Sequence, residues 1–164
     1  HVMFADSFCD ELRKVIVAAS QNRNATVHEG GTYICMEGPQ FSTRAESHFY
    51  REAAGATVIG MTALPEAKLA REAEMCYGML AMGTDYDCWH ESEEDVSVEA
   101  VLQVLKENAT LANSIVQEVS HLLPQESDCN CLNAAQFAII TAPEAISKAA
   151  KQRLKVLYGH YFNS

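Results

Sequence analysis

The chain has 164 residues, of which 48% are hydrophobic and 21% are charged, a composition typical of folded globular proteins. Its formal net charge of −10 argues against binding to nucleic acid or to an anionic membrane surface, because both rely on cationic side chains. No stretch approaches 18 consecutive apolar residues, so we expect no membrane span. The lack of a secretory pattern predicts a cytoplasmic protein, with the nucleus as a second location.

The length corresponds to one domain, at roughly 150 residues per domain. We interpret residues 1–164 as a single domain, with a helical C-terminal extension at 141–164. The first residue is His1 rather than methionine, and it leads directly into sequence of a folded pattern. We therefore expect a cleaved product or a fragment.

Helical and strand patterns alternate along the chain. Apolar residues at helical spacing predict helices at 7–21, 43–53, 65–77 and 97–123, and again after residue 141. Short apolar runs predict strands at 32–36, 57–61 and 79–82, while 134–140 fits either a strand or a helix. Strands that alternate with helices favour an α/β fold with a largely parallel sheet.

Local signals fix the ends of these helices. Ser7 can cap the first helix, Thr43 and Glu46 form a capping box, and Pro65 suits a first helical position. A second capping box, with a proline inside it, is expected at 141–144. The longest helix should bury one apolar stripe, formed by Val101, Leu105, Ala109, Ala112, Val116 and Val119.

The six cysteines show one close pair, Cys129 and Cys131, separated by a single asparagine. The other four are scattered through apolar segments, where a cysteine usually behaves as a small buried hydrophobe: Cys9, Cys35, Cys76 and Cys88. We interpret the close pair as reduced thiols in a polar loop, with a redox or metal role as the alternative.

Chemically useful residues follow each predicted strand. Residues 37–42, 60–62 and 84–87 together offer an aromatic ring, hydroxyls and two carboxylates. Ligands of parallel α/β sheets bind at the carboxyl ends of the strands, so these stretches form the candidate site. Each also has a simpler interpretation, as a turn, a packing glycine or solvated acids. Asp85 and Asp87 lack the further oxygen ligands of a divalent-metal loop, so we expect no metal.

Three motifs, at 38–47, 58–66 and 84–89, carry a more specific signal. In order and spacing they resemble the trimeric purine nucleoside phosphorylase family, from His1 to about Ile140. The resemblance implies the family's mixed, largely parallel central sheet flanked by helices, here without its N-terminal half, and a homotrimer. The branch it resembles most splits 5'-methylthioadenosine, with phosphate as co-substrate and no cofactor, into adenine and 5-methylthioribose 1-phosphate. This is a step of methionine and purine salvage.

The resemblance also implies roles for individual residues. Asp85 and Asp87 would face the imidazole and amino edge of adenine as the catalytic pair, and either could carry the proton to the base. Phe41 would stack on the purine, and Thr62 would reach phosphate. The other implied substrate contacts are Ser42, Ile59, Gly60, Met61, Tyr86, Val96, Val98 and Leu102.

Four positions bear on substrate choice. Relatives that use 6-oxopurines carry asparagine in place of Asp85 and glutamate in place of Ser42. Relatives that accept a 5'-hydroxyl carry histidine in place of Val98, whereas valine would form an apolar pocket for a methylthio group, or only the core face of the long helix. Gly60 departs from this branch, which often has asparagine there.

By the same resemblance, a neighbouring subunit would close the 5' pocket with His1 and Ile140. Two alternatives stay open. One is a purine nucleoside phosphorylase of broader choice, against which Asp85 and Val98 argue. The other is a non-enzymatic nucleoside-binding or assembly module. Because the family's phosphate-binding residues lie mostly in the half that is absent here, we expect the isolated 164-residue chain to be inactive.

Overall fold

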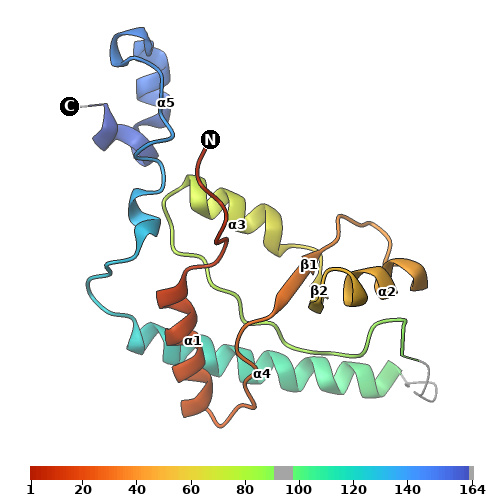
Figure 1. Cartoon of the computed structure of the whole chain (residues 1–164). Coiled ribbons are helices and arrows are strands. Elements are labelled where there is room, and N and C mark those ends of the chain that lie inside the picture. Colours follow the sequence, from red (N-terminus) through yellow and green to blue (C-terminus); the bar gives the residue numbers. More distant parts are fainter. Residues whose placement is uncertain (91–97, 163–164) are drawn as a thin grey trace.

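The fold is taken from a computed structural model that describes residues 1–90 and 98–162, with residues 98–101 described by their backbone alone. Two strands, β1 (Thr32–Cys35) and β2 (Ala56–Gly60), accompany five α-helices (Figure 1). The helices are α1 (Asp10–Asn22), α2 (Arg44–Glu52), α3 (Ala63–Glu72), α4 (Val98–Leu122) and α5 (Lys148–Tyr158). Short 3-10 turns follow α4 and flank α5, at Asn130–Asn133, Pro143–Ala145 and Gly159–Tyr161.

β1, α2 and β2 form a parallel β-α-β unit, as the sequence predicts. Tyr33 lies opposite Val58 and Cys35 lies opposite Gly60 in the parallel register. The predicted capping box begins α2: the Thr43 hydroxyl accepts the backbone N–H of Glu46, and the Thr43 N–H donates to the Glu46 carboxylate. Helix α2 therefore starts at a fixed point after β1, which positions the residues of its first turn.

The prediction of a third strand at 79–82 is wrong for the part of the chain that the structure describes. Residues 79–82 run without regular secondary structure, and the sheet formed by the described residues has two strands. An apolar run becomes a strand only where its backbone N–H and C=O groups meet those of a neighbouring strand, and the described residues do not supply one here. The segment 134–140 forms turns, so neither the strand nor the helix expected there is present.

Several helix ends also differ from prediction. Cys9, not Ser7, is the N-cap of α1, and it makes no side-chain cap. Pro65 is the third residue of α3 rather than the first. Helix α3 ends at Glu72, because Glu74 adopts a left-handed backbone with φ of 58°. The predicted cap at 141–144 gives a short 3-10 turn, and the Ser147 hydroxyl caps α5 instead.

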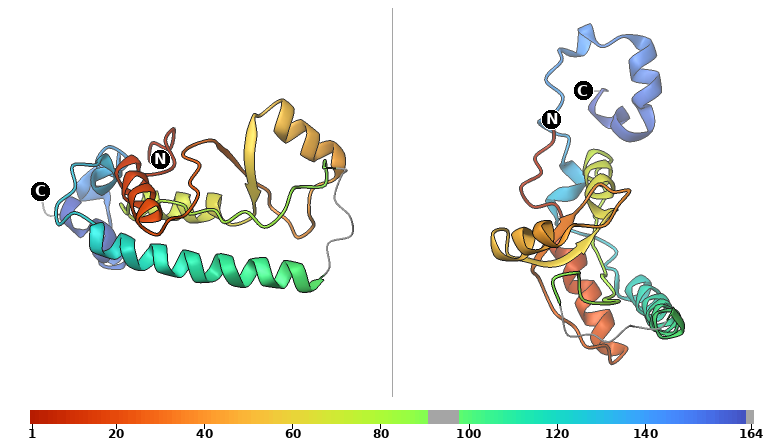
Figure 2. Two further views of the ribbon diagram at one scale, coloured as in Figure 1. Left: turned by 90° about the horizontal axis from the view of Figure 1, so that it is seen from below. Right: turned by 90° about the vertical axis from the view of Figure 1, so that its right-hand side faces the viewer.

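Helix α4 lies along one side of the molecule, and α1 packs against it (Figure 2). Ala19 of α1 and Ile115 of α4 are fully buried. Leu105 and Val116, two members of the predicted stripe, are exposed. With 13 residues against 25, α1 is too short to cover the whole apolar face of α4. None of the described helices is long and apolar enough to cross a membrane.

The C-terminal segment with α5 extends away from the β-α-β unit (Figures 1 and 2). It is fastened to the end of α3 by polar contacts. The Tyr158 hydroxyl donates to the carbonyl of Glu72, and the Tyr161 hydroxyl donates to the carboxylate of Glu74. Glu74 also accepts the backbone N–H of Ala135, so one buried side chain joins α3 to two later parts of the chain.

Candidate functional site

The loops that follow β1 and β2 touch, as expected for the carboxyl ends of parallel neighbours. Gly38, in the loop after β1, has a left-handed backbone with φ of 78°. A Cβ atom at Gly38 would lie 2.3 Å from the terminal methyl of Met61, which follows β2. Glycine is therefore needed here both for its conformation and for the close approach of the Met61 side chain.

Asp87 is held by groups from two different segments. The Ser47 hydroxyl donates to Asp87 Oδ2 at 2.5 Å, and the backbone N–H of Cys88 donates to Oδ1 at 2.8 Å. Ser47 is 2% exposed and lies in α2, directly after the capping box. The Cys88 thiol also donates to the carbonyl of Ser42 at 3.6 Å. These contacts bring the loop after β1 together with residues 87–88.

Asp85 lies in the same loop and is exposed. The Thr84 hydroxyl donates to Asp85 Oδ2 at 2.8 Å. One residue earlier, the carbonyl of Gly83 accepts the side-chain amide of Asn108, from α4, at 2.8 Å. The segment 83–88 is thus fixed at one end by α4 and at the other by α2, with both acids on it.

Aromatic side chains lie between and after the two acids. Tyr86 stacks on His90, with ring centroids 4.6 Å apart and an angle of 15° between the planes. Trp89 meets Tyr86 edge-on, and the guanidinium of Arg51 lies 3.8 Å from the centre of the Trp89 ring. Tyr86 remains 62% exposed, and Phe41 is 80% exposed. Both rings are accessible for stacking on a planar ligand.

Gly60 is a packing glycine. A Cβ atom built there would lie 1.8 Å from the hydroxyl oxygen of Tyr33 and 2.7 Å from its ring carbon Cζ. Its carbonyl accepts the backbone N–H of Met36 at 2.9 Å. The absence of asparagine at this position is thus explained by the ring of Tyr33, which occupies the space of any side chain.

Thr62, the expected phosphate contact, is the N-cap residue of α3. Burial raises the pKa of the neighbouring Tyr33 phenol, and the backbone N–H groups of Thr62 and Ala63 act in the opposite direction by favouring its charged form. A cavity of about 100 Å³ lies next to these residues, lined by Ser7, Phe8, Tyr33, Cys35, Ala63, Leu64 and Ala67. It is smaller than the roughly 300–1,000 Å³ typical of small-molecule sites.

Among the remaining predicted residues, those that the structure describes are not gathered into one pocket. Ile59 pairs with Ile34 in the sheet, and Leu102 is exposed on α4. Val96 lies outside the described residues, and Val98 is the first residue of α4, with its side chain also outside them. His1 is exposed, and Ile140 is 91% exposed.

Ser47, Arg51 and Asn108 are contacts that sequence reasoning missed. Ser47 directly follows a recognisable capping box, which fixes its place in the first turn of a helix, but its partner Asp87 is 40 residues away. Arg51 lies one turn further along α2. Asn108 lies within a helical sequence pattern, and nothing in that pattern indicates a contact with Gly83.

Comparison with known proteins gives this arrangement a family. A sequence profile of the phosphorylase superfamily matches residues 1–121. The chain belongs to this superfamily. This phosphorylase-superfamily chain is 53% identical to S-methyl-5'-thioadenosine phosphorylase of Geobacter sulfurreducens, over 98% of its own length and 56% of the relative's. It is 49% identical to the enzyme of the same name from Koribacter versatilis, over 99% of its own length and 55% of the relative's.

Solved structures agree with this assignment. The crystal structure of methylthioadenosine phosphorylase from an Antarctic soil metagenomic library matches with a TM-score of 0.88 and 43% identity, over 96% of this chain and 56% of that one. Methylthioadenosine phosphorylase from Schistosoma mansoni, in complex with adenine, matches with a TM-score of 0.69 and 30% identity. The match covers 83% of this chain and 53% of that one. The α/β phosphorylase fold expected from the sequence is confirmed. The chain spans about half the length of the curated relatives it matches.

Proposed function

We propose that the protein carrying this chain catalyses the phosphorolysis of 5'-methylthioadenosine to adenine and 5-methylthioribose 1-phosphate. The observation that carries the proposal is the loop 83–88, which bears Asp85 and Asp87 and is held to α2 and α4 through Ser47 and Asn108. The relatives named for this activity support it. So does the Schistosoma enzyme, whose structures contain adenine or methylthioadenosine.

The two carboxyl groups suit the charge changes of this reaction. As the bond from the sugar to the purine breaks, negative charge builds on the departing base. A proton-sharing carboxyl at the imidazole edge relieves that charge, while a carboxylate at the amino edge accepts the exocyclic N–H. Phe41 and Tyr86 are exposed beside the same loops and provide faces on which the purine can stack.

Selectivity for a 6-aminopurine follows from the same residues. Asp85 can accept from an amino group, whereas it has no donor for the oxygen of a 6-oxopurine. Gly60, the one position that resembles the 6-oxopurine relatives, is accounted for by its packing against Tyr33 and does not argue for broader choice. The apolar side chain of Val98 suits a methylthio group better than a hydroxyl.

We further propose that phosphate is the only co-substrate, that no organic cofactor takes part, and that the working enzyme is a homotrimer. Thr62 would contact phosphate, with other phosphate ligands supplied from outside this chain. Ile140 is 91% exposed, so its side chain is accessible to a neighbouring subunit. Ile140 and His1 would then close a neighbour's 5' pocket.

The full-length protein tests this proposal. Incubated with 5'-methylthioadenosine, it should release adenine only when phosphate is present, and it should turn over inosine much more slowly. Asp85→Asn should lower kcat/KM for methylthioadenosine by about 100-fold, which is the scale of a positioned proton-transfer group. It should also reduce the ratio of kcat/KM for methylthioadenosine to kcat/KM for inosine. Release of adenine without phosphate, or equal kinetics of the variant on both substrates, would contradict the proposed role. Light scattering of the same sample tests the trimer.

A further inference from the structure

Four cysteines from three distant segments meet beside the start of α1. Cys9 directly precedes α1, Cys76 follows α3, and Cys129 and Cys131 lie at the turn after α4. Their Sγ atoms all lie within 4.8 Å of one another, and those of Cys76 and Cys129 are 3.2 Å apart. Cys9 and Cys131 are buried and the other two are half-buried. The candidate active site uses none of them.

We propose that these four cysteines bind one zinc ion, through four thiolates, as a structural site. In tetrahedral coordination a Zn–S distance of about 2.3 Å places the sulfur atoms about 3.8 Å from one another. Small rotations of the four side chains reach this arrangement. Two disulfides would need closeness only within each pair, whereas here every sulfur lies close to the other three. An iron–sulfur cluster, whose cysteines bind different irons, would hold them further apart.

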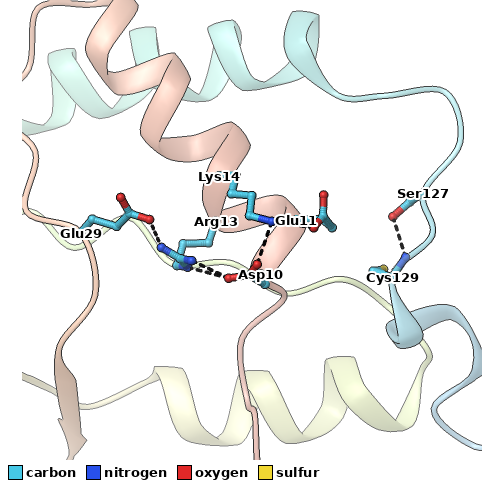
Figure 3. A network of polar contacts seen from close by, with 7 residues as sticks. All are labelled: Asp10, Glu11, Arg13, Lys14, Glu29, Ser127 and Cys129. Atoms are coloured by element: carbon cyan, nitrogen blue, oxygen red, sulfur yellow. Dashed lines mark hydrogen bonds and ion pairs between the residues drawn. The ribbon is translucent and has the colours of Figure 1, made fainter.

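The backbone around the cluster already holds the ligands in place. The N–H of Cys9 donates to the carbonyl of Tyr77 at 2.8 Å, which joins the segment before α1 to the segment after α3. The N–H of Cys129 donates to the hydroxyl of Ser127, within the chain that follows α4 (Figure 3). Cys9 is the N-cap of α1, so the start of this helix fixes its place in the chain.

A bound cation would favour the thiolate form of all four cysteines, because its positive charge compensates theirs. The Sγ atoms are close enough to one another for a single ion to contact all four.

A site with four protein ligands leaves no open position for substrate, so its role is structural. The ion would bind the chain after α4 to the start of α1 and the end of α3. Glu74, two residues before Cys76, joins the same segments through Ala135 and Tyr161. The sequence analysis favoured reduced thiols for Cys129 and Cys131 and kept a redox or metal role as the alternative, because these two are the one close pair of cysteines in the sequence. The superfamily profile ends at residue 121, before either of these two ligands.

Metal analysis of the full-length protein, expressed without a metal-binding tag and purified anaerobically, tests the site. We expect about one zinc per chain, and X-ray absorption should show four sulfur neighbours at about 2.3 Å. Cys9→Ser and Cys129→Ser should lower the zinc content at least tenfold. Cys88→Ser is the matched control, since Cys88 is exposed and lies outside the cluster, and it should keep its zinc.

The absorption measurement on the unaltered protein decides the matter even where a serine variant does not fold. A zinc-free protein with four free thiols would overturn the proposal. So would an intact mass lowered by two disulfides, an iron ion in place of zinc, or zinc bound by nitrogen or oxygen. Removal of the zinc by a chelator should lower the unfolding temperature of the full-length protein, since a structural ion stabilises only the folded state.

Discussion

Ser47 gives the sharpest test of how this fold supports the candidate site. Ser47 is 2% exposed, and its hydroxyl donates to Asp87. Ser47→Ala removes that donor and leaves both acids in place. A hydrogen bond to a charged group contributes about 1.5–3 kcal/mol, which corresponds to about 10-fold to 150-fold in kcat/KM if all of it positions Asp87. The N–H of Cys88 continues to hold the other oxygen. We therefore expect a loss near the lower end, about tenfold, in phosphate-dependent adenine release.

Thr43→Ala is the matched control, because Thr43 caps the same helix without contact to Asp87. Loss of the cap should destabilise α2 by about 1 kcal/mol. Kinetics measured well below the unfolding temperature separate the two effects: Ser47→Ala should lower kcat/KM of the folded enzyme, while Thr43→Ala should lower stability alone. Equal losses of kcat/KM in both variants would refute the positioning role of Ser47.

Three further predictions concern stability. Gly60→Ala should destabilise the fold by about 1–3 kcal/mol in chemical denaturation, because its Cβ collides with an aromatic side chain, whereas the control Gly83→Ala, with nothing within 4 Å of its Cβ, should not. Glu74→Gln should weaken the buried junction with the C-terminal segment by about 1–3 kcal/mol, seen as faster release of that segment in limited proteolysis. Burial and the Glu66 carboxylate raise the pKa of Tyr77 to about 12. The free energy of unfolding should therefore fall as the pH rises from about 10 to about 12, and it should fall less in Tyr77→Phe. The same dependence of unfolding free energy on pH in both proteins would count against this.

The parts of the fold that sequence predicted are those decided by neighbouring residues. The capping box of Thr43 and Glu46 starts α2 whatever surrounds it, and the short apolar runs on either side pair as β1 and β2. The 79–82 run was predicted on the same grounds but lies outside the sheet. Whether such a run becomes a strand depends on a partner strand, which its own residues do not encode. Likewise α3 ends before the left-handed Glu74, whose carboxylate accepts hydrogen bonds from residues 135 and 161, and these distant partners leave no mark in the local pattern.

The candidate site divides in the same way. Asp85 and Asp87 could be singled out because they follow an apolar run and share a short motif, and the structure places both on one fixed loop. Their supports could not, since Ser47 and Asn108 are ordinary polar residues whose partners lie 40 and 25 positions away. The four-cysteine cluster is a third case. Its members look like separate small hydrophobes until the fold brings their sulfur atoms together.

The contacts that hold loop 83–88 of the candidate site are separate from those that hold the C-terminal segment. Loop 83–88 depends on α2 and α4, through Ser47 and Asn108. The C-terminal segment depends on Glu74 and on the cysteine cluster, at the opposite end of α3 from the strands. Because the two sets share no residue, their effects should add rather than couple. Loss of the four-cysteine cluster should therefore loosen the C-terminal segment, while the geometry around Asp87 should persist.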